Sequence, residues 1–249
     1  MSSFHGSVLH IDSQTLARVS STHQRLQRSN KLNEDNKNTN DNNDNINKDR
    51  DYNNSTVSNI LSPMSDTCRA LEKNFSMIRV LYITSTESSN ELYYFSLSIF
   101  VSLQELYIDL CPPSTIKGLY DFRNQLKLLK IINSGIPELM KALAPGVKED
   151  ILKQYKPIVL DNYSNDIASN LRWSQVSDLK LSNCGITRLD QSMHLFPSVQ
   201  TLDLSKNDIS HIIHLQDCYS LSELNLSHNR IRVLSNVGRV LGIIILLLI

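Results

Sequence analysis

The chain has 249 residues, of which 41% are hydrophobic, enough for one sizeable folded domain with a tail. Lysine plus arginine equals aspartate plus glutamate at 25 each, so no net basic field favours nucleic acid as a partner. The four cysteines form no C-x-x-C pair, and residues 1–30 lack the apolar core of a secretory signal. Together these features favour the reducing cytosol.

Residues 1–64 are predicted to be a disordered N-terminal tail. Eleven asparagines fall between Asn30 and Asn54, and this tract has almost no large apolar residue to offset the cost of ordering its backbone. The preceding segment, Ile11 to Leu26, has a sparse amphipathic pattern that predicts no more than a frayed helix.

Residues 65–100 are predicted to form an N-terminal cap. Ser65 or Asp66 is suited to begin a helix that runs through Phe75. Residues 79–84 and 92–99 have the composition of two strands, and the turn residues between them predict a hairpin. A helix and hairpin here would cover the apolar end of the segment that follows.

From residue 101 onward one pattern recurs. The segment Val199–Ile209 fits L-x-x-L-x-L-x-x-N-x-L at every marked place, and further copies begin at Val176 before it and at Leu221 after it. Two weaker copies begin at Leu103 and Leu126, with the same spacing between them. This is the leucine-rich repeat signature, in which the ninth place is Asn or Cys.

The spacing of the repeat predicts its geometry. Places four and six point the same way along a short strand, and one repeat cannot bury that face alone. Asn207 at the ninth place is expected to bind backbone groups of the turn, while Ile212 and Leu215 close the convex side. The predicted fold class is therefore an α/β leucine-rich repeat solenoid with a parallel concave sheet over residues 101–249. Three residues before each copy, a recurring pocket is expected at Phe100, Arg123, Trp173, Phe196 and Cys218.

The repeat rhythm breaks at a predicted helical insertion near residues 137–160. Pro137 and Glu138 favour the start of a helix that ends before Pro145. A second helix is predicted over residues 147–155, followed by a displaced strand at residues 158–160.

Residues 240–249 are nearly all apolar, but a membrane-spanning helix needs ~20 residues, so no transmembrane span is predicted. Instead, Ile244 and Leu246 match places four and six of a further repeat, which would lie beside Leu224 and Leu226. The chain stops inside this predicted strand, which favours a fragment truncated at its C-terminus.

No constellation of catalytic residues is evident. His211 and His214 form an H-x-x-H pair, but they fall on a convex turn without a third ligand, so we interpret them as surface polar residues and predict no metal site. Ser227 and His228 are neighbours whose side chains point to opposite faces. No glycine-rich nucleotide loop is present, and no cofactor is predicted. We therefore predict a protein that is not an enzyme; an enzyme is the alternative of another class and would need a pocket with converging groups.

The remaining candidate is the concave face of the sheet. Places three, five and seven of each repeat point to this side, and solenoids use such surfaces to bind ligands. The predicted partner is a protein. The predicted protein-binding residues are Glu105, Tyr107, Asp109, Lys130, Asp178, Lys180, Thr201, Asp203, Ser205, Glu223, Asn225 and Ser227.

The order of elements carries a resemblance. The segment between Phe95 and Val240 begins with an irregular first repeat, followed by Leu-Lys-Leu-Leu-Lys after Gln125. An insertion that ends at Pro157 comes next, and three regular repeats follow it. This order resembles the N-terminal region of the serine/threonine kinase 11-interacting protein family (LKB-interacting proteins). The resemblance implies a cytoplasmic, non-enzymatic scaffold that binds a serine/threonine kinase and influences its location. The short repeat period is also similar to that of phosphatase-regulatory leucine-rich subunits, which are the alternative.

Overall fold

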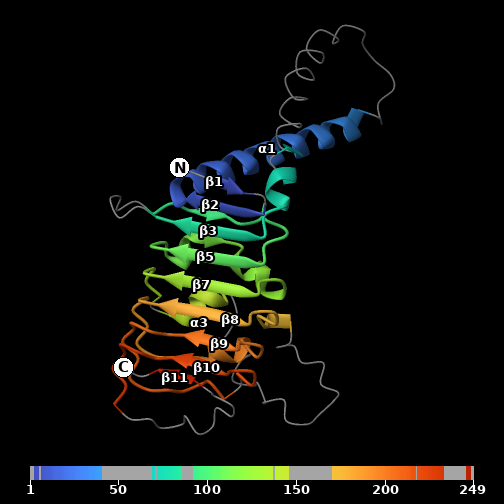
Figure 1. Ribbon diagram of the computed structural model, residues 1–249. Coiled ribbons are helices and arrows are strands. Elements are labelled where there is room, and N and C mark those ends of the chain that lie inside the picture. Colours follow the sequence, from blue (N-terminus) through green and yellow to red (C-terminus); the bar gives the residue numbers. More distant parts are fainter. Residues whose placement is uncertain are drawn as a thin grey trace, which may run out of the picture.

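The computed structural model describes residues 3–5, 7–40, 69–70, 72–85, 92–136, 138–145, 170–216, 218–232 and 245–247. Figure 1 shows the strands stacked in one column, with α1 crossing the N-terminal end. The strands are β1 (Ser3–His5), β2 (Val8–Asp12), β3 (Val80–Thr84), β4 (Phe95–Ser96), β5 (Glu105–Asp109), β6 (Ile116–Lys117), β7 (Leu128–Ile132), β8 (Asp178–Ser182), β9 (Thr201–Asp203), β10 (Glu223–Asn225) and β11 (Ile245–Leu247). The helices are α1 (Ser13–Asn40) and α3 (Leu139–Leu143), with 3-10 turns η1 (Pro113–Thr115), η2 (Leu119–Asn124) and η4 (Gln191–Leu195).

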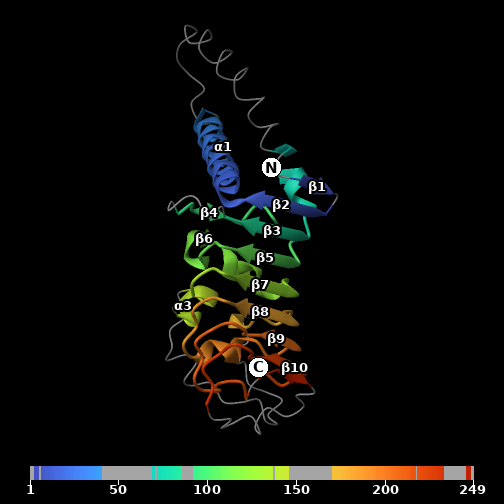
Figure 2. The same cartoon turned by 60° about the vertical axis from the view of Figure 1, so that its left-hand side comes forward.

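Among the described residues, nine strands form one sheet in the order β1-β2-β3-β5-β7-β8-β9-β10-β11. β1 is antiparallel to β2, and all later neighbours are parallel. Pairing follows the repeat, because place four meets place four, as in Leu106 with Leu129 and Leu179 with Leu202. The sheet lies on one side of the column, and β4, β6 and α3 lie on the other (Figure 2). The predicted solenoid is therefore confirmed.

The core lies between the sheet and these connecting segments. Leu204 and Leu226, at place six of their repeats, are buried as the pattern predicts, and so are Ile212 and Leu215 on the convex side. The recurring pocket is also present at most of its predicted positions. Phe100, Trp173, Phe196 and Cys218 are buried, and the Trp173 and Phe196 rings stack with centroids 5.7 Å apart, whereas Arg123 is half-buried.

The ninth-place asparagine binds the turn as predicted. The Asn207 Oδ1 accepts hydrogen bonds from the backbone N–H groups of Cys184 at 3.0 Å and Ile186 at 3.2 Å. Its Nδ2 donates to the carbonyl oxygens of Leu181 at 2.7 Å and Leu204 at 2.8 Å. One side chain thus ties the turns of two adjacent repeats together, where backbone groups would otherwise be buried without partners.

The prediction of a disordered tail over residues 1–64 is wrong for its first part, because β1, β2 and α1 lie between Ser3 and Asn40. In β2, Leu9 and Ile11 alternate with outward residues and enter the core. The first turns of α1 bury Leu16 fully, but they also bury the polar Ser20 and His23. The polar residues on the buried face explain the weak helical pattern in the sequence. The Asn-rich residues 41–64 lie outside the described part of the chain.

The predicted cap over residues 65–100 also needs correction. Residues 69–70 and 72–76 are helical, in agreement with the prediction. β3, however, is not part of a hairpin but a strand of the main sheet, parallel to both β2 and β5. The other predicted strand shrinks to β4, which pairs in parallel with β6 in a separate sheet. The N-terminal end of the main sheet is formed by the β1–β2 pair, with α1 beside it.

The sequence of β3 in fact carries the repeat pattern. Ile78, Leu81 and Ile83 occupy places one, four and six and are fully buried. Phe75 stands three residues before this copy, and its ring meets that of Phe100 edge-on, with centroids 5.4 Å apart. The recurring pocket therefore extends one repeat further toward the N-terminus than predicted.

Two further predictions concern the insertion and the C-terminal strand. The first helix of the insertion is present as the short α3, while residues 146–169, with the second helix and displaced strand, lie outside the described residues. β11 pairs with β10 as predicted, but its register differs, because Leu246 rather than Ile244 lies opposite Leu224. The shift is two residues, which equals the strand period.

Candidate protein-binding surface

The candidate site is the outward face of the main sheet, which we define as the residues at places three, five and seven of the repeats of β2, β3, β5, β7, β8, β9 and β10. Their neighbours at places four and six are buried, so the period of the strand turns these side chains away from the core. The structure places these predicted residues on that face, half-buried or exposed: Glu105, Tyr107, Asp109, Lys130, Asp178, Lys180, Thr201, Asp203, Glu223, Asn225 and Ser227.

The fifth places line up in one row across the strands. The row begins with three stacked rings: His10 lies 4.1 Å from Tyr82, and Tyr82 lies 4.2 Å from Tyr107, between ring centroids. The Tyr107 hydroxyl donates to Glu105 Oε2 at 3.0 Å. Burial, followed by this hydrogen bond, raises the pKa of Tyr107 above its ordinary value, so the hydroxyl stays protonated.

The row continues with charged side chains. The Lys130 Nζ lies 5.8 Å from the centroid of the Tyr107 ring, within the range of a cation–π contact. On the next strands, Lys180 forms a salt bridge and hydrogen bond with Asp203. Burial alone would raise the pKa of Asp203, but hydrogen bonds from Lys180 and Ser205 outweigh it and hold the pKa below its ordinary value. The Asp203 carboxylate is therefore charged and satisfied within the sheet.

Ser205 is the predicted site residue that the structure does not offer to a partner. It is buried, and its Oγ lies 3.0 Å from that of Ser182, which occupies the seventh place on the neighbouring strand. The Ser205 backbone N–H also donates to Asp203 Oδ1 at 2.9 Å. The chain has begun to turn inward at this point, so strand alternation no longer predicts exposure.

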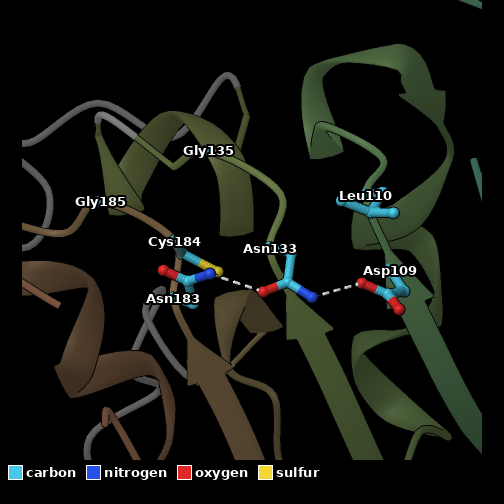
Figure 3. A pocket seen from close by; sticks show the side chains of 7 residues that line it. All are labelled: Asp109, Leu110, Asn133, Gly135, Asn183, Cys184 and Gly185. Carbon is cyan, nitrogen blue, oxygen red and sulfur yellow. Dashed lines mark hydrogen bonds between the residues drawn. The ribbon is translucent and has the colours of Figure 1, made fainter. Parts of the chain in front are cut away.

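A second row of polar groups lies where the strands end. The Asn183 Nδ2 donates to Asn133 Oδ1 at 2.7 Å, and the Asn133 Nδ2 donates to Asp109 Oδ1 at 2.8 Å (Figure 3). These side chains line an open depression together with Leu110, Gly135, Cys184 and Gly185. The hydrogen bonds run from strand to strand and leave Asp109 with acceptor capacity toward the outward face.

The eighth place of the repeats of β5, β7, β8, β9 and β10 has a left-handed backbone. The φ angle lies between 50° and 57° at Leu110, Asn133, Asn183, Lys206 and His228. Asparagine tolerates this conformation, whereas a leucine adopts it at a cost of ~1–2 kcal/mol. Leu110 is therefore a strained, half-buried apolar residue at the border of the depression.

Sequence reasoning missed two members of the fifth-place row, His10 and Tyr82, because β2 and β3 were not recognised as strands of the main sheet. The signal for β3 was available: Ile78, Leu81 and Ile83 fit the repeat, and Phe75 stands where an aromatic residue recurs. The signal for β2 was weaker, since only places four and six are apolar.

The other candidate groups of the sequence are the histidine pair and the cysteines. No three His, Cys, Asp or Glu side chains in the described part of the chain gather as ligands of a metal ion would. His211 is exposed, and His214 meets His194 edge-on with ring centroids 5.5 Å apart. Burial raises the pKa of the Cys184 thiol to about 11. Within the same residues, none of the helices combines the length and apolarity needed to cross a bilayer.

A family model supports the repeat. Residues 174–231 match the family model described as "Leucine rich repeat". This chain carries leucine-rich repeats. Among solved structures, internalin C2 from Listeria monocytogenes is similar over 72% of this chain and 84% of its own, with 16% sequence identity and a TM-score of 0.33. The family match covers the repeats of β8, β9 and β10, whose ninth places are Cys184, Asn207 and Asn229.

Proposed function

We propose that this leucine-rich repeat chain is a cytoplasmic protein-interaction scaffold, without catalytic activity of its own, that binds its partner with the outward face of the sheet. The observation that carries the proposal is the unbroken fifth-place row, in which neighbouring strands pair in register from His10 to Asn225. Such a row offers aromatic, cationic and acidic groups on one rigid support, as solenoid binding surfaces do. The proposed contacts are Glu105, Tyr107, Asp109, Lys130, Asp178, Lys180, Thr201, Asp203, Glu223, Asn225 and Ser227.

The finer proposal is that the partner is a serine/threonine kinase whose location the scaffold influences. It is supported by the order of the repeats and of the insertion, which resembles that of kinase-interacting proteins. The short repeat period equally suits a phosphatase-regulatory subunit, so a phosphatase catalytic subunit is the alternative partner.

Affinity capture with the full chain tests both proposals. The bait is compared with a face variant, Glu105→Lys with Glu223→Lys, and with a matched control, Asp121→Lys with Glu138→Lys. The two control residues are exposed and lie outside the outward face. Each variant replaces two carboxylates with two lysines, so both change the net charge equally. A partner that the control retains and the face variant loses is expected, and mass spectrometry shows whether it is a kinase or a phosphatase. Equal recovery of every protein by both variants would contradict the proposed face.

Imaging of the tagged chain in cells tests the cytoplasmic assignment separately. The fluorescence is expected in the cytoplasm, and co-expression of the captured kinase is expected to change the distribution of that kinase. A kinase whose distribution is the same with and without the scaffold would contradict the role in localisation.

A further inference from the structure

The polar groups of the outward face differ in how far they already bind one another. On β8 to β10, Lys180 pairs with Asp203, and the Ser227 hydroxyl donates to Asn225 Oδ1 at 2.7 Å. On β5, each of two carboxylates accepts one described hydrogen bond, Glu105 from Tyr107 and Asp109 from Asn133. A carboxylate has about four acceptor positions, so both retain capacity for a partner.

The three outward residues of β5 form a regular acidic pattern. Glu105, Tyr107 and Asp109 alternate with the buried Leu106 and Ile108, so all three side chains leave the same face. At a rise of ~3.3 Å per residue, the positions of the two carboxylates are separated by roughly 13 Å along the strand. This is also the separation of residues i and i+4 in any other extended chain.

The neighbouring strand adds an apolar surface in register with these carboxylates. Leu128 on β7 lies opposite Glu105, and Ile132 lies opposite Asp109; both are outward and half-buried. A long basic side chain that reaches either carboxylate can lay its aliphatic stem on the adjacent Leu128 or Ile132. Tyr107 stands between them, and tyrosine is a residue type that dominates binding energy at protein interfaces.

We propose that β5 and β7 bind an extended segment of a partner protein with the pattern basic-x-apolar-x-basic. The two basic side chains pair with Glu105 and Asp109, and the apolar residue between them contacts Tyr107. This inference rests on the proposed scaffold function and names the chemistry of its partner. The charge on the two strands favours a basic partner, because their outward residues include two carboxylates and only one ammonium group, that of Lys130.

Lys130 restricts the residue that the site accepts at the middle of the segment. Its ammonium lies over the Tyr107 ring and opposite the centre of the proposed segment, where a third cation would be repelled. It therefore selects a non-basic residue at the middle position. Replacing Lys130 with Ala is expected to strengthen binding of the basic segment, because a like charge is removed.

Fluorescence anisotropy with the full chain and synthetic peptides tests the pattern. The probe Arg-Ser-Leu-Ser-Arg, flanked by glycines, is compared with Ser-Arg-Leu-Arg-Ser, which has the same composition but directs its arginines to the opposite face of an extended chain. The first peptide is expected to bind at least about tenfold more tightly, since two charge-assisted hydrogen bonds depend on its register. Equal affinities, or no binding of either peptide at millimolar concentration, would overturn the proposal.

Matched variants locate the site. Glu105→Gln with Asp109→Asn keeps the side-chain shapes and is expected to weaken binding by at least about tenfold. The control Asp121→Asn with Glu138→Gln removes the same net charge elsewhere and is expected to change affinity by less than about twofold, as exposed distant charges do. Equal effects of the two variants would show binding to the net charge of the chain and would reject β5 as the site.

Tyr107→Ala tests the central contact and is expected to cost at least about tenfold in affinity. If it unfolds, as seen by circular dichroism, Tyr107→Phe with its ring retained is expected to bind within about threefold of the original chain. This inference fails separately from the scaffold proposal. A captured partner lost by the face variant, together with no register-dependent peptide binding, would leave the scaffold in place and remove the motif.

Discussion

The repeats of β5 and β7 differ from those of β9 and β10 in what holds their turns. In the C-terminal repeats, Asn207 and Asn229 each bind backbone groups of two turns. Further toward the N-terminus the ninth place is Ser134 or Cys111. Ser134 receives a hydrogen bond from the Cys111 backbone N–H at 3.2 Å, and the Cys111 thiol contacts Thr115 within its own repeat.

How well a repeat fits the sequence pattern and how many of its polar groups are available to a partner are separate properties of this sheet. The C-terminal repeats fit the leucine-rich pattern best, and several of their outward polar groups are bound to one another, as Lys180 is to Asp203. The less regular strands carry the ring stack and the carboxylates with open acceptor positions on β5. The comparison teaches that the turns held by asparagine belong to the matched repeats, whereas the ring stack and the β5 carboxylates lie on strands outside them.

The largest expected effect tests whether the irregular strands are as much a part of the fold as the regular ones. Leu81→Ala on β3 and Leu204→Ala beyond β9 both remove a fully buried leucine, so each is expected to lower the free energy of unfolding by ~2–5 kcal/mol. Urea denaturation measures both, with the exposed His211→Ala as a nearly silent control. A silent Leu81→Ala would mean that β3 is not packed as described.

The next effect sharpens the comparison between the turns. Asn207→Ala leaves several buried backbone groups without a partner and is expected to cost ~1–3 kcal/mol of stability. Ser134→Ala removes fewer hydrogen bonds and is expected to cost about 1 kcal/mol. Both values come from the same urea titrations. A larger loss for Ser134→Ala would reverse the proposed division between the two regions.

A smaller effect concerns the left-handed eighth place. Leu110→Asn replaces a strained leucine and is expected to raise stability by about 1 kcal/mol. The reciprocal Asn183→Leu introduces the strain and removes the hydrogen bond to Asn133, so it is expected to lower stability by ~1–2 kcal/mol. Thermal melts compare the two. If Leu110→Asn destabilises the protein, packing of the leucine outweighs its backbone strain.

The smallest effect is a dependence of stability on pH. The folded-state pKa of Asp203 lies below its ordinary value of 3.8, so the unfolded chain binds the proton more readily. The ionised Asp203 carboxylate therefore contributes fully to the free energy of unfolding above this pH, and this contribution is lost as the pH falls through the lowered pKa. Asp203→Asn is expected to flatten the fall in stability below about pH 4. The free energy of unfolding is measured for both chains at pH values on either side of the ordinary pKa of an aspartate. If it falls as steeply with pH in Asp203→Asn as in the original chain, Lys180 does not hold this carboxylate.

Much of the solenoid was predictable from residue spacing. The buried Leu106, Leu129 and Leu202 follow from a pattern that also sets strand register, because equivalent places meet across the sheet. The strand β2 escaped prediction because it has only Leu9 and Ile11 as repeat residues, whereas β3 was predicted as a strand but assigned to a hairpin. The first half of α1 was predicted only as a frayed helix because its buried face includes polar residues, and burial of a polar residue depends on contacts that no local pattern reveals.

The candidate surface was predictable as a set of residues but not as a set of contacts. A period of two identified Tyr107, Lys130 and Lys180 as outward. Which of them touch depends on the strand placed next to each, and Lys130 and Lys180 are partners on neighbouring strands although an insertion separates them in the sequence. The burial of Ser205 likewise depends on its contact with Ser182 from another repeat.

The pairing of β2 with β3 has a consequence for the order in which the protein folds. Val8 and Val80 are partners in the sheet, whereas the C-terminal strands pair residues only one repeat apart, as Thr201 pairs with Glu223. Closing a loop about three times longer costs ~1 kcal/mol more in chain entropy. We expect the strands from β5 to β10 to assemble first and β1, β2 and α1 to dock last, so their amide hydrogens should exchange fastest. Late docking would complete the ring stack, because His10 reaches Tyr82 only when β2 is in place.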